Sequence, residues 1–349
     1  MPSFRLLTAV RQTALLFAVD RVVDARVLAA DPGDPNTLYL GTGTPDSGGR
    51  AEIFKSTNAG ANWVRTGALP PFFVPSAIVF DNQSAIYVSG EFGGIIKSTD
   101  GGENWIHLET TGMPGEARAQ VWDLAIDPYD SSTLFATTPL GGAYKSVDSG
   151  VSWARMALPI SPSTIAVDPA KRSTVYAVFE EPGPGVFKSS DAGARWVPIN
   201  NGLPQISPYV FVSSIALNPT DTDVIYATTH AGIFKSTTAG ARWIPASTHL
   251  HKPLRAFSLT VSGQDPLTIY ALGANGLYVT NDGAKSWQPA RKGSSPQGRH
   301  HSLIVVDPKT VFVVQSDSRI ETARPFKTCD GGKTWSDISK KIRRSLTSP

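Results

Sequence analysis

Cysteine is almost absent from this chain, and long hydrophobic runs are missing altogether. Among 349 residues there is one cysteine, Cys329, so a disulfide within the chain is excluded and the redox compartment stays open. No stretch approaches the ~20 apolar residues of a membrane-spanning helix. The apolar segment after Arg5 is interrupted at Arg11, which makes the N-terminus a poor signal peptide.

Helical periodicity is missing as well. No helical period of convincing length occurs after residue 22, and residues 6–17 fit a set of helical turns as well as an extra strand. What recurs instead is a box of the form Ser-x-Asp-x-Gly-x-x-Trp, of which Ser98–Trp105 is the cleanest copy. Seven copies end in tryptophan at intervals of 42–48 residues, a period typical of a propeller or a solenoid. The repeated tryptophans are Trp63, Trp105, Trp153, Trp196, Trp243, Trp287 and Trp335.

Each repeat holds four short runs rich in β-branched and aromatic residues, separated by Gly, Pro and Asp turns. The third repeat has its runs at 121–127, 132–138, 143–146 and 153–156. Four strands per period make one propeller blade. The sequence therefore predicts an all-β, seven-bladed β-propeller with four-stranded antiparallel blades, whose strands are named A to D from the inside outward. The expected blades are residues 22–67, 72–110, 119–158, 162–200, 211–248, 255–290 and 300–340.

Two segments flank the expected propeller. Residues 1–21 are an N-terminal extension and residues 341–349 a basic tail. Because the first and last blades each hold strands A to D, the ring can close by packing alone. Alternatively, Thr13–Val19 could pair onto another blade as a latch strand.

The box lies between strands C and D, and its composition is that of a turn. Glycine tolerates positive φ, the Ser and Asp side chains bond backbone groups of the turn, and the tryptophan begins strand D and buries its ring between blades. A catalytic acid is not needed seven times, and Asn58 and Thr238 replace it in two boxes. We therefore predict that the box is structural. The boxes that keep the acid contain Asp100, Asp148, Asp191, Asp282 and Asp330.

The box resembles the Asp-box, or BNR, repeat of sialidases, xyloglucan-degrading glycosidases, sortilin-type receptors and photosystem II assembly factors, over about residues 22–340. The resemblance gives sialidases six blades, sortilin-type receptors ten, xyloglucanases two seven-bladed propellers in tandem, and the assembly factors seven. Blade number and length favour the assembly-factor-like group, which implies a non-enzymatic binding or assembly scaffold. Such propellers are often exported, so we expect a periplasmic or extracellular protein although no clear signal peptide is present.

A functional site is expected away from the boxes. In a propeller the C-to-D turns lie on one face, and the B-to-C and D-to-A loops lie on the other, around the channel mouth. Residues 1–130 carry a net charge of −6 and residues 131–349 a net charge of +9. The resulting basic sector on blades five to seven favours a protein or carbohydrate partner with acidic groups. We expect a monomer that binds no nucleic acid. The candidates for partner binding are Arg118, Trp122, Arg255, Arg291, Arg299, His300, His301, Arg319 and Arg324.

The main alternative is a glycoside hydrolase, which needs two carboxylates about 5–10 Å apart across the scissile bond. The Arg-Ile-Pro segment of sialidases is missing here, and the resemblance gives xyloglucanases one catalytic aspartate on each of two propellers. Both departures count against catalysis. The loop carboxylates that could serve are Asp46, Glu91, Glu116, Asp123, Glu180, Glu181 and Glu321.

Two weaker signals remain. A carbohydrate-binding or sortilin-like module is favoured if Trp122, Phe72 or Phe73 line the channel mouth. Otherwise Trp122 fills the core beside the channel. Four histidines fall in two consecutive D-to-A loops, but their spacing matches no metal motif, so we predict neither a metal nor a cofactor. These histidines are His249, His251, His300 and His301.

Overall fold

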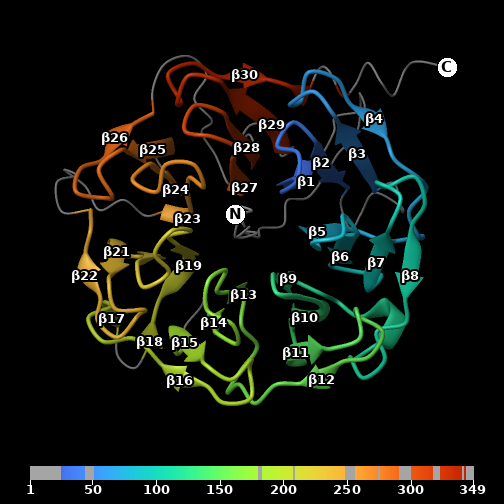
Figure 1. Ribbon diagram of the computed structural model, residues 1–349, viewed down its shortest axis with the longest axis horizontal. Coiled ribbons are helices and arrows are strands. Elements are labelled where there is room, and N and C mark those ends of the chain that lie inside the picture. The colour runs from blue at the N-terminus through green and yellow to red at the C-terminus, as the bar shows by residue number, and fades with distance from the viewer. Residues whose placement is uncertain are drawn as a thin grey trace.

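The chain folds into a ring of seven four-stranded antiparallel sheets around a central axis (Figure 1). The all-β class and the seven blades predicted from the sequence are therefore confirmed. Within the described ranges, no helix is long and apolar enough to cross a bilayer. The computed structural model describes residues 25–43, 51–179, 183–206, 209–247, 256–273, 276–290, 300–316, 323–339 and 342.

Each blade runs from an inner strand A to an outer strand D. The A strands are β1 (Ala25–Ala30), β5 (Pro75–Phe80), β9 (Asp123–Asp127), β13 (Thr164–Val167), β19 (Val212–Leu217), β23 (Ala256–Val261) and β27 (His300–Val305). The B strands are β2 (Leu38–Thr42), β6 (Ile86–Gly90), β10 (Asp130–Thr138), β14 (Val175–Val178), β20 (Ile225–Thr229), β24 (Ile269–Gly273) and β28 (Val311–Ser316). The C strands are β3 (Glu52–Ser56), β7 (Ile95–Ser98), β11 (Gly142–Ser146), β15 (Val186–Ser189), β21 (Gly232–Ser236), β25 (Gly276–Thr280) and β29 (Ala323–Thr328). The D strands are β4 (Val64–Arg65), β8 (Ile106–Leu108), β12 (Ala154–Arg155), β16 (Val197–Pro198), β22 (Ile244–Pro245), β26 (Gln288–Pro289) and β30 (Ser336–Asp337).

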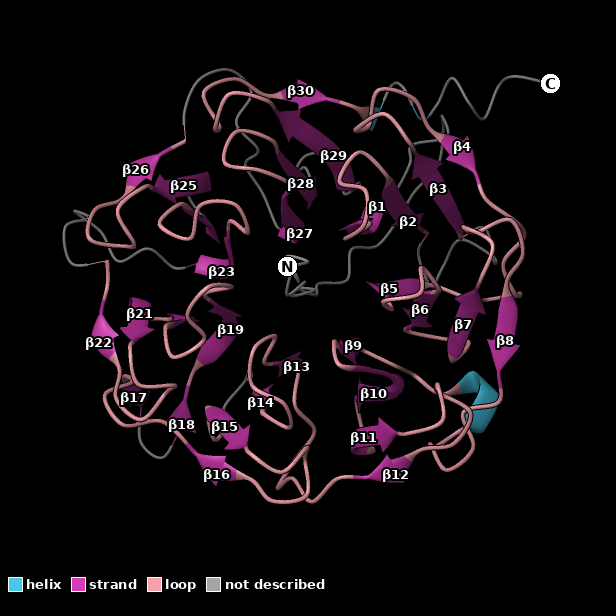
Figure 2. Cartoon of the chain, viewed as in Figure 1, coloured by secondary structure: helices cyan, strands magenta, loops and turns pink. Residues whose placement is uncertain are grey.

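Loops and turns connect these strands (Figure 2). Within the part of the chain that the structure describes, two short elements interrupt the D-to-A connections: the 3₁₀ helix η1 (Glu116–Arg118) and a hairpin of β17 (Gln205–Ile206) with β18 (Tyr209–Val210). Because consecutive strands are antiparallel, the A-to-B turns and the boxes lie on one face, which we call the box face. The B-to-C and D-to-A loops lie on the opposite face, which we call the loop face.

The core consists of seven hydrophobic clusters, each lying between two neighbouring blades. Each cluster contains or contacts one of the repeated tryptophans. A blade buries only part of its apolar surface within itself, and the neighbouring blade covers the rest. The tryptophan ends the box one residue before strand D, as Trp63 does before β4, instead of beginning that strand as the sequence suggested.

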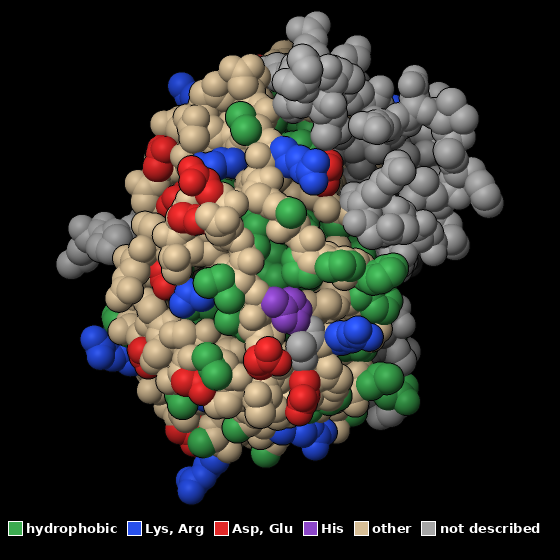
Figure 3. All heavy atoms as spheres, turned by 90° about the vertical axis from the view of Figure 1, so that its right-hand side faces the viewer, with side chains coloured by type: hydrophobic (Ala, Val, Ile, Leu, Met, Phe, Trp, Pro, Cys, Tyr) green, Lys and Arg blue, Asp and Glu red, His purple; other side chains and the backbone are tan. Residues whose placement is uncertain are grey.

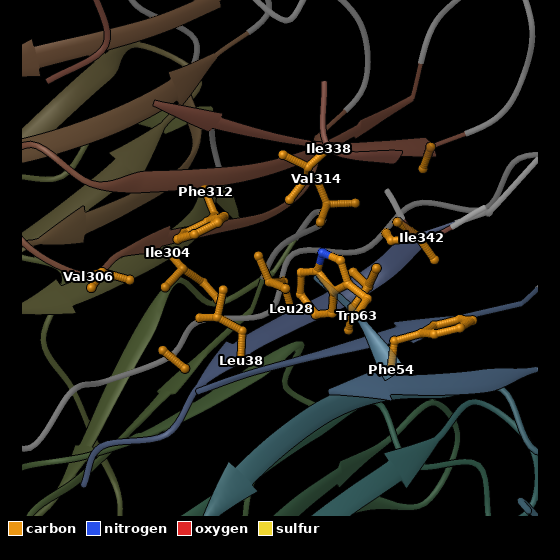
Figure 4. Close-up of a cluster of buried hydrophobic side chains, with 14 residues drawn as sticks. Leu28, Leu38, Phe54, Trp63, Ile304, Val306, Phe312, Val314, Ile338 and Ile342 are labelled. Carbon is orange, nitrogen blue, oxygen red and sulfur yellow. The ribbon is translucent and has the colours of Figure 1, made fainter. Parts of the chain in front are cut away.

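The ring closes by packing between blades one and seven (Figure 4). Trp63 and Leu38 of blade one lie against Phe312 and Val314 of blade seven, and Ile342, which follows the last blade, is fully buried among them. Among the described strands, β1 pairs with β2 and β30 pairs with β29, so each terminal blade contains four strands of its own. The proposed latch strand, Thr13–Val19, lies outside the described residues.

The box is a turn held by its own side chains. In the second box the Ser98 hydroxyl donates to Asp100 Oδ1 at 2.8 Å and accepts the backbone N–H of Gly102 at 2.8 Å. Asp100 Oδ1 also accepts the backbone N–H of Asn104 at 2.9 Å. Gly101 and Gly102 both have positive φ, 72° and 92°, a conformation that glycine adopts without strain.

The boxes that lack aspartate show what the turn requires. Asn58 Oδ1 accepts the N–H of Asn62 at 2.8 Å, and Thr238 Oγ1 accepts the N–H of Arg242 at 3.1 Å. Both atoms take the place of the carboxylate oxygen. The turn thus needs an acceptor oxygen at this position and not a negative charge, which is the physical reason why the position varies.

Acid is expected to weaken this propeller through its box aspartates. The N–H of Asn104 lowers the pKa of Asp100 to about 2, and the Thr334 hydroxyl lowers the pKa of Asp330 to about 2. An unfolded aspartate has a pKa of about 3.9. Lowered pKa values in the folded state contribute stability that is fully present above about pH 4 and is lost as the pH falls through about 2. Urea unfolding at a series of pH values should show this loss.

The variant Asp100→Asn provides the matched control, because box one carries asparagine at this position. We expect it to fold and to lose stability less steeply than the wild type between about pH 4 and about pH 2. An equally steep loss in both proteins would show that the box carboxylates do not govern acid unfolding.

A lysine in strand C joins each of four blades to the box of the next one. Lys55 Nζ donates to the carbonyl of Gly101 at 3.2 Å, and Lys327 Nζ donates across the ring closure to Ala59 at 2.6 Å. Lys145 and Lys235 make the equivalent bonds. Lys55 also lies over the Tyr39 ring, 5.5 Å from its centroid, where a cation is attracted by the ring face. The lysines can be recognised in the sequence of each repeat, whereas the carbonyl groups that accept their hydrogen bonds cannot.

Candidate functional site

Seven residues, one from each blade, surround the axis where the A strands begin on the loop face. In five blades the pairing of strands A and B shifts register there, which leaves one residue of strand A unpaired as a β-bulge. In the other two blades, residues 122 and 163 occupy the same position, directly before the pairs Asp123–Thr137 and Thr164–Val178. Bulges of this kind redirect a side chain and are frequent beside functional sites. We call the seven residues the axial ring: Arg26, Ser76, Trp122, Ser163, Ser213, Phe257 and His301.

The axial ring combines hydrogen-bonding and aromatic side chains. The six members whose side chains are described are all partly exposed, although the side chain of Arg26 is only 10 % exposed. Ser76 Oγ donates to the carbonyl of Val121 at 2.7 Å, and the N–H of Trp122 donates to Thr137 at 2.7 Å. Trp122 and Phe257 lie three blades apart around the axis, with two serines between them. Such a ring suits a partner that offers both apolar groups and hydrogen-bonding groups.

Asp123, directly after Trp122, is a buried carboxylate that connects two blades. Its side chain is buried, with only 2 % of the residue exposed. Oδ1 accepts the N–H of Leu124 and Oδ2 accepts the N–H of Ile165 in blade four, each at 3.0 Å. Both oxygens therefore bond backbone donors, and the carboxylate fixes β9 against β13.

Glu91 is the second carboxylate beside the ring, and it pairs with a ring member. Its Oε2 lies 3.2 Å from Nη1 of Arg26, and the two side chains are 18 % and 10 % exposed. The N–H of Glu91 donates to Val74 at 2.8 Å. The ion pair connects blade one to blade two, and truncating one partner would leave the other charge nearly buried and unpaired.

The other candidates from the sequence are distributed widely. Arg118 is exposed in η1, and Arg324 lies 3.6 Å from Asp337 of its own blade, with Nε buried and without a hydrogen-bond partner. His300 and His301 begin β27, and His301 joins Trp122 in the axial ring. Arg255, Arg291, Arg299 and Arg319 lie outside the described residues.

The carboxylates proposed for a glycoside hydrolase and the aromatic candidates also lie in different environments. Glu116 is exposed in η1, Phe72 is 70 % exposed and Phe73 is 1 % exposed. Asp46, Glu180, Glu181 and Glu321 lie outside the described ranges, as do His249 and His251. Within those ranges, no group of three or more His, Cys, Asp or Glu side chains could hold a metal ion, and Cys329 is an exposed free thiol.

Reasoning from the sequence missed five of the seven ring members: Arg26, Ser76, Ser163, Ser213 and Phe257. The signal that finds them is strand register, because each lies three residues before the strand-A partner of the aromatic residue of strand B, as Arg26 does before Ala29, the partner of Tyr39. Aligning the repeats on that aromatic residue instead of on the tryptophan would have brought five of the seven positions together, because the A-to-B turns of blades two and seven are two residues shorter.

Comparison with known proteins finds similarity to a xyloglucanase and to other propellers. No family model matches it. A probable oligoxyloglucan-reducing end-specific xyloglucanase of Neosartorya fischeri is 24% identical over 331 residues, which cover 92% of this chain and 35% of the relative. The chain thus spans about a third of the length of that curated relative.

Two solved structures share the propeller. The GH74 enzyme of Niastella koreensis has a TM-score of 0.63 at 19% identity, over 90% of this chain and 59% of its own. YCF48, solved bound to D1 peptide, has a TM-score of 0.63 at 15% identity, over 86% of this chain and 94% of its own. At these identities the likeness establishes the fold alone.

Proposed function

We propose that this protein is a non-enzymatic binding propeller that engages a protein partner on the loop face, at the axial ring. The observation that carries the proposal is that both described carboxylates beside the ring have structural partners. Asp123 bonds two backbone N–H groups, and Glu91 pairs with Arg26. Hydrolysis of a glycosidic bond needs one carboxyl group to give a proton and another to attack or to activate water.

The surroundings of the ring fit recognition. Half-buried aromatic side chains on a rigid scaffold are typical anchors of protein interfaces. In the solved structure most relevant to this point, YCF48 holds a peptide, and this chain matches 94% of that protein's length. The basic sector on blades five to seven, with Arg255, Arg291, Arg299 and Arg319, belongs to the same proposal and would favour acidic partners. We also propose that the protein is exported, as its resemblance to other propellers suggests.

The test is selection of peptides by the ring. A phage-displayed library of random dodecapeptides is panned on the wild type, and selected peptides are measured by isothermal titration calorimetry. Trp122→Ala should weaken binding at least about 10-fold, and Trp122→Phe should retain most of it. Melting temperatures of all variants show whether the fold is kept. Peptides that bind Trp122→Ala as tightly as the wild type would overturn the proposal.

A glycoside hydrolase is the second candidate, favoured by the 24% identity to a xyloglucanase over 92% of this chain. Incubation with xyloglucan oligosaccharides and an assay for new reducing ends decides between the two. We expect no turnover above the heat-denatured control. Turnover that disappears in Asp123→Asn, in a protein that still melts cooperatively, would establish the enzyme and exclude the first proposal.

A further inference from the structure

Five segments of the D-to-A and B-to-C loops form a continuous surface over blades two to four, which we call the rim: residues 66–74, 91–94, 109–119, 139–141 and 155–162. Each contacts the next. The N–H of Val74 donates to Phe92, and the N–H of Gly94 donates to Ala119. A methyl group at Gly141 would lie 2.8 Å from Cγ of Pro114, and Nε of Arg155 donates to the carbonyl of Gly141 at 2.7 Å.

The rim exposes apolar side chains on four of its five segments. Leu140 is 95 % exposed, Phe72 70 %, Ile160 46 % and Phe92 40 %. None of the four belongs to a hydrophobic cluster of the core. Seen from the side of blades two and three, hydrophobic side chains gather beside a histidine, with both basic and acidic groups around them (Figure 3). Exposed apolar groups that lie side by side mark interaction surfaces.

Backbone geometry holds one of these side chains outward. Phe72 has a φ of 62°, in the left-handed region, while Phe73 beside it is 1 % exposed. A methyl group at Gly93 would lie 3.0 Å from the Phe73 ring, so glycine leaves the space that this ring fills. The loop thus exposes Phe72, in a conformation that is unfavourable for a large residue, and buries Phe73, the next residue.

The unpaired charges of the rim are balanced, because Glu91 of segment 91–94 forms an ion pair with Arg26. Arg118 and Arg155 are exposed, as are Glu109 and Glu116, and among the described residues none of the four takes part in an ion pair. Arg155 Nε donates to the carbonyl of Gly141 at 2.7 Å, which places its guanidinium beside Leu140. The five segments contain no lysine and no aspartate, and interfaces between proteins are depleted in both and enriched in arginine and aromatic residues.

We infer that the rim is the interface of a two-fold dimer of this chain. A two-fold interface brings the same surface of both copies together, so it must complement itself. Apolar groups satisfy this condition because they pack against apolar groups of the other copy. Two arginines with two glutamates satisfy it because each copy offers an anion for every cation of the other. An anionic lipid surface would instead favour an excess of cations. The segments hold roughly 35 residues, against about 20–30 on each side of a standard interface.

This inference departs from the monomer expected from the sequence and does not depend on the proposed function, because no member of the axial ring belongs to the rim. Blades five to seven, which carry the basic sector, contribute no segment to the rim.

Sedimentation velocity of the full chain between about 1 and about 200 µM tests the dimer, which should form with a Kd in the micromolar range. The double variant Phe72→Glu/Leu140→Glu should weaken association at least about 10-fold. Its matched control is Ile244→Glu/Leu267→Glu, which charges two apolar residues that are 49 % and 55 % exposed in blades five and six and should associate like the wild type. Trp122→Ala should also associate normally.

Each other outcome overturns the dimer. The dimer is excluded if the wild type stays monomeric over the whole concentration range. It is also excluded if the rim variant associates as strongly as the wild type. The rim would be assigned to a lipid surface if a monomeric wild type floated with vesicles of phosphatidylcholine and phosphatidylglycerol and the rim variant did not. The milder variant Leu140→Ser should show the same direction of change, with an unchanged melting temperature.

Discussion

Replacing Trp243 by alanine is expected to lower the free energy of unfolding by about 3–5 kcal/mol. The side chain is 2 % exposed and lies between blades four and five, among Tyr176, Val178 and Phe234. Its Nε1 donates to the carbonyl of Ile199 at 2.6 Å. The variant would lose the contacts of the indole, leave a cavity between two blades and leave a carbonyl without its donor.

Urea unfolding followed by circular dichroism measures this change, and two variants calibrate it. Trp105 is only half-buried at its own blade interface, so we expect Trp105→Ala to lose about half as much stability. Ile244, the next residue after Trp243, is 49 % exposed, and Ile244→Ala should change stability little. If Trp105→Ala destabilised the protein as much as Trp243→Ala, burial between blades would not explain the tryptophan of the repeat.

Replacing Asp123 by alanine is expected to lower the free energy of unfolding by about 2–4 kcal/mol. The variant leaves the buried N–H groups of Leu124 and Ile165 without the acceptors they have in the wild type, and a buried donor that loses its partner costs about 1–3 kcal/mol. Because Ile165 belongs to blade four, the variant also loosens the contact between two blades. The measurement is again urea unfolding.

The graded control is Asp123→Asn, which keeps one acceptor oxygen and should lose less stability than Asp123→Ala. The comparison also separates the two functional candidates. A structural carboxylate affects folding and leaves peptide binding at the axial ring measurable in the asparagine variant. An aspartate whose removal leaves stability unchanged would contradict the structural role and direct attention back to hydrolysis.

The fold was accessible from the sequence because its determinants are local and repeated. The box fixes a turn through atoms within eight residues of one another, such as Ser98 Oγ and the N–H of Gly102. Counting the boxes counted the blades. Even the exceptions followed local chemistry, because Asn58 and Thr238 supply the same acceptor oxygen as aspartate.

The candidate site was only partly accessible. Trp122 and His301 were chosen for their residue type and loop position, and the structure brings them into one ring. Arg26 was overlooked because its place depends on a register shift between β1 and β2, and residue types in the sequence do not predict such a shift. Glu91 was noted as a possible catalytic group, and its partner Arg26 lies 65 residues away in the sequence.

The sequence by itself thus determined the number of blades, the four strands in each and the face on which the boxes lie, because turns and strand patterns depend on neighbours along the chain. The tertiary structure decided which charges are paired, which side chains surround the axis and which loops expose apolar groups. Those properties depend on contacts between blades, where residues distant in sequence meet and where burial decides the strength of every polar interaction.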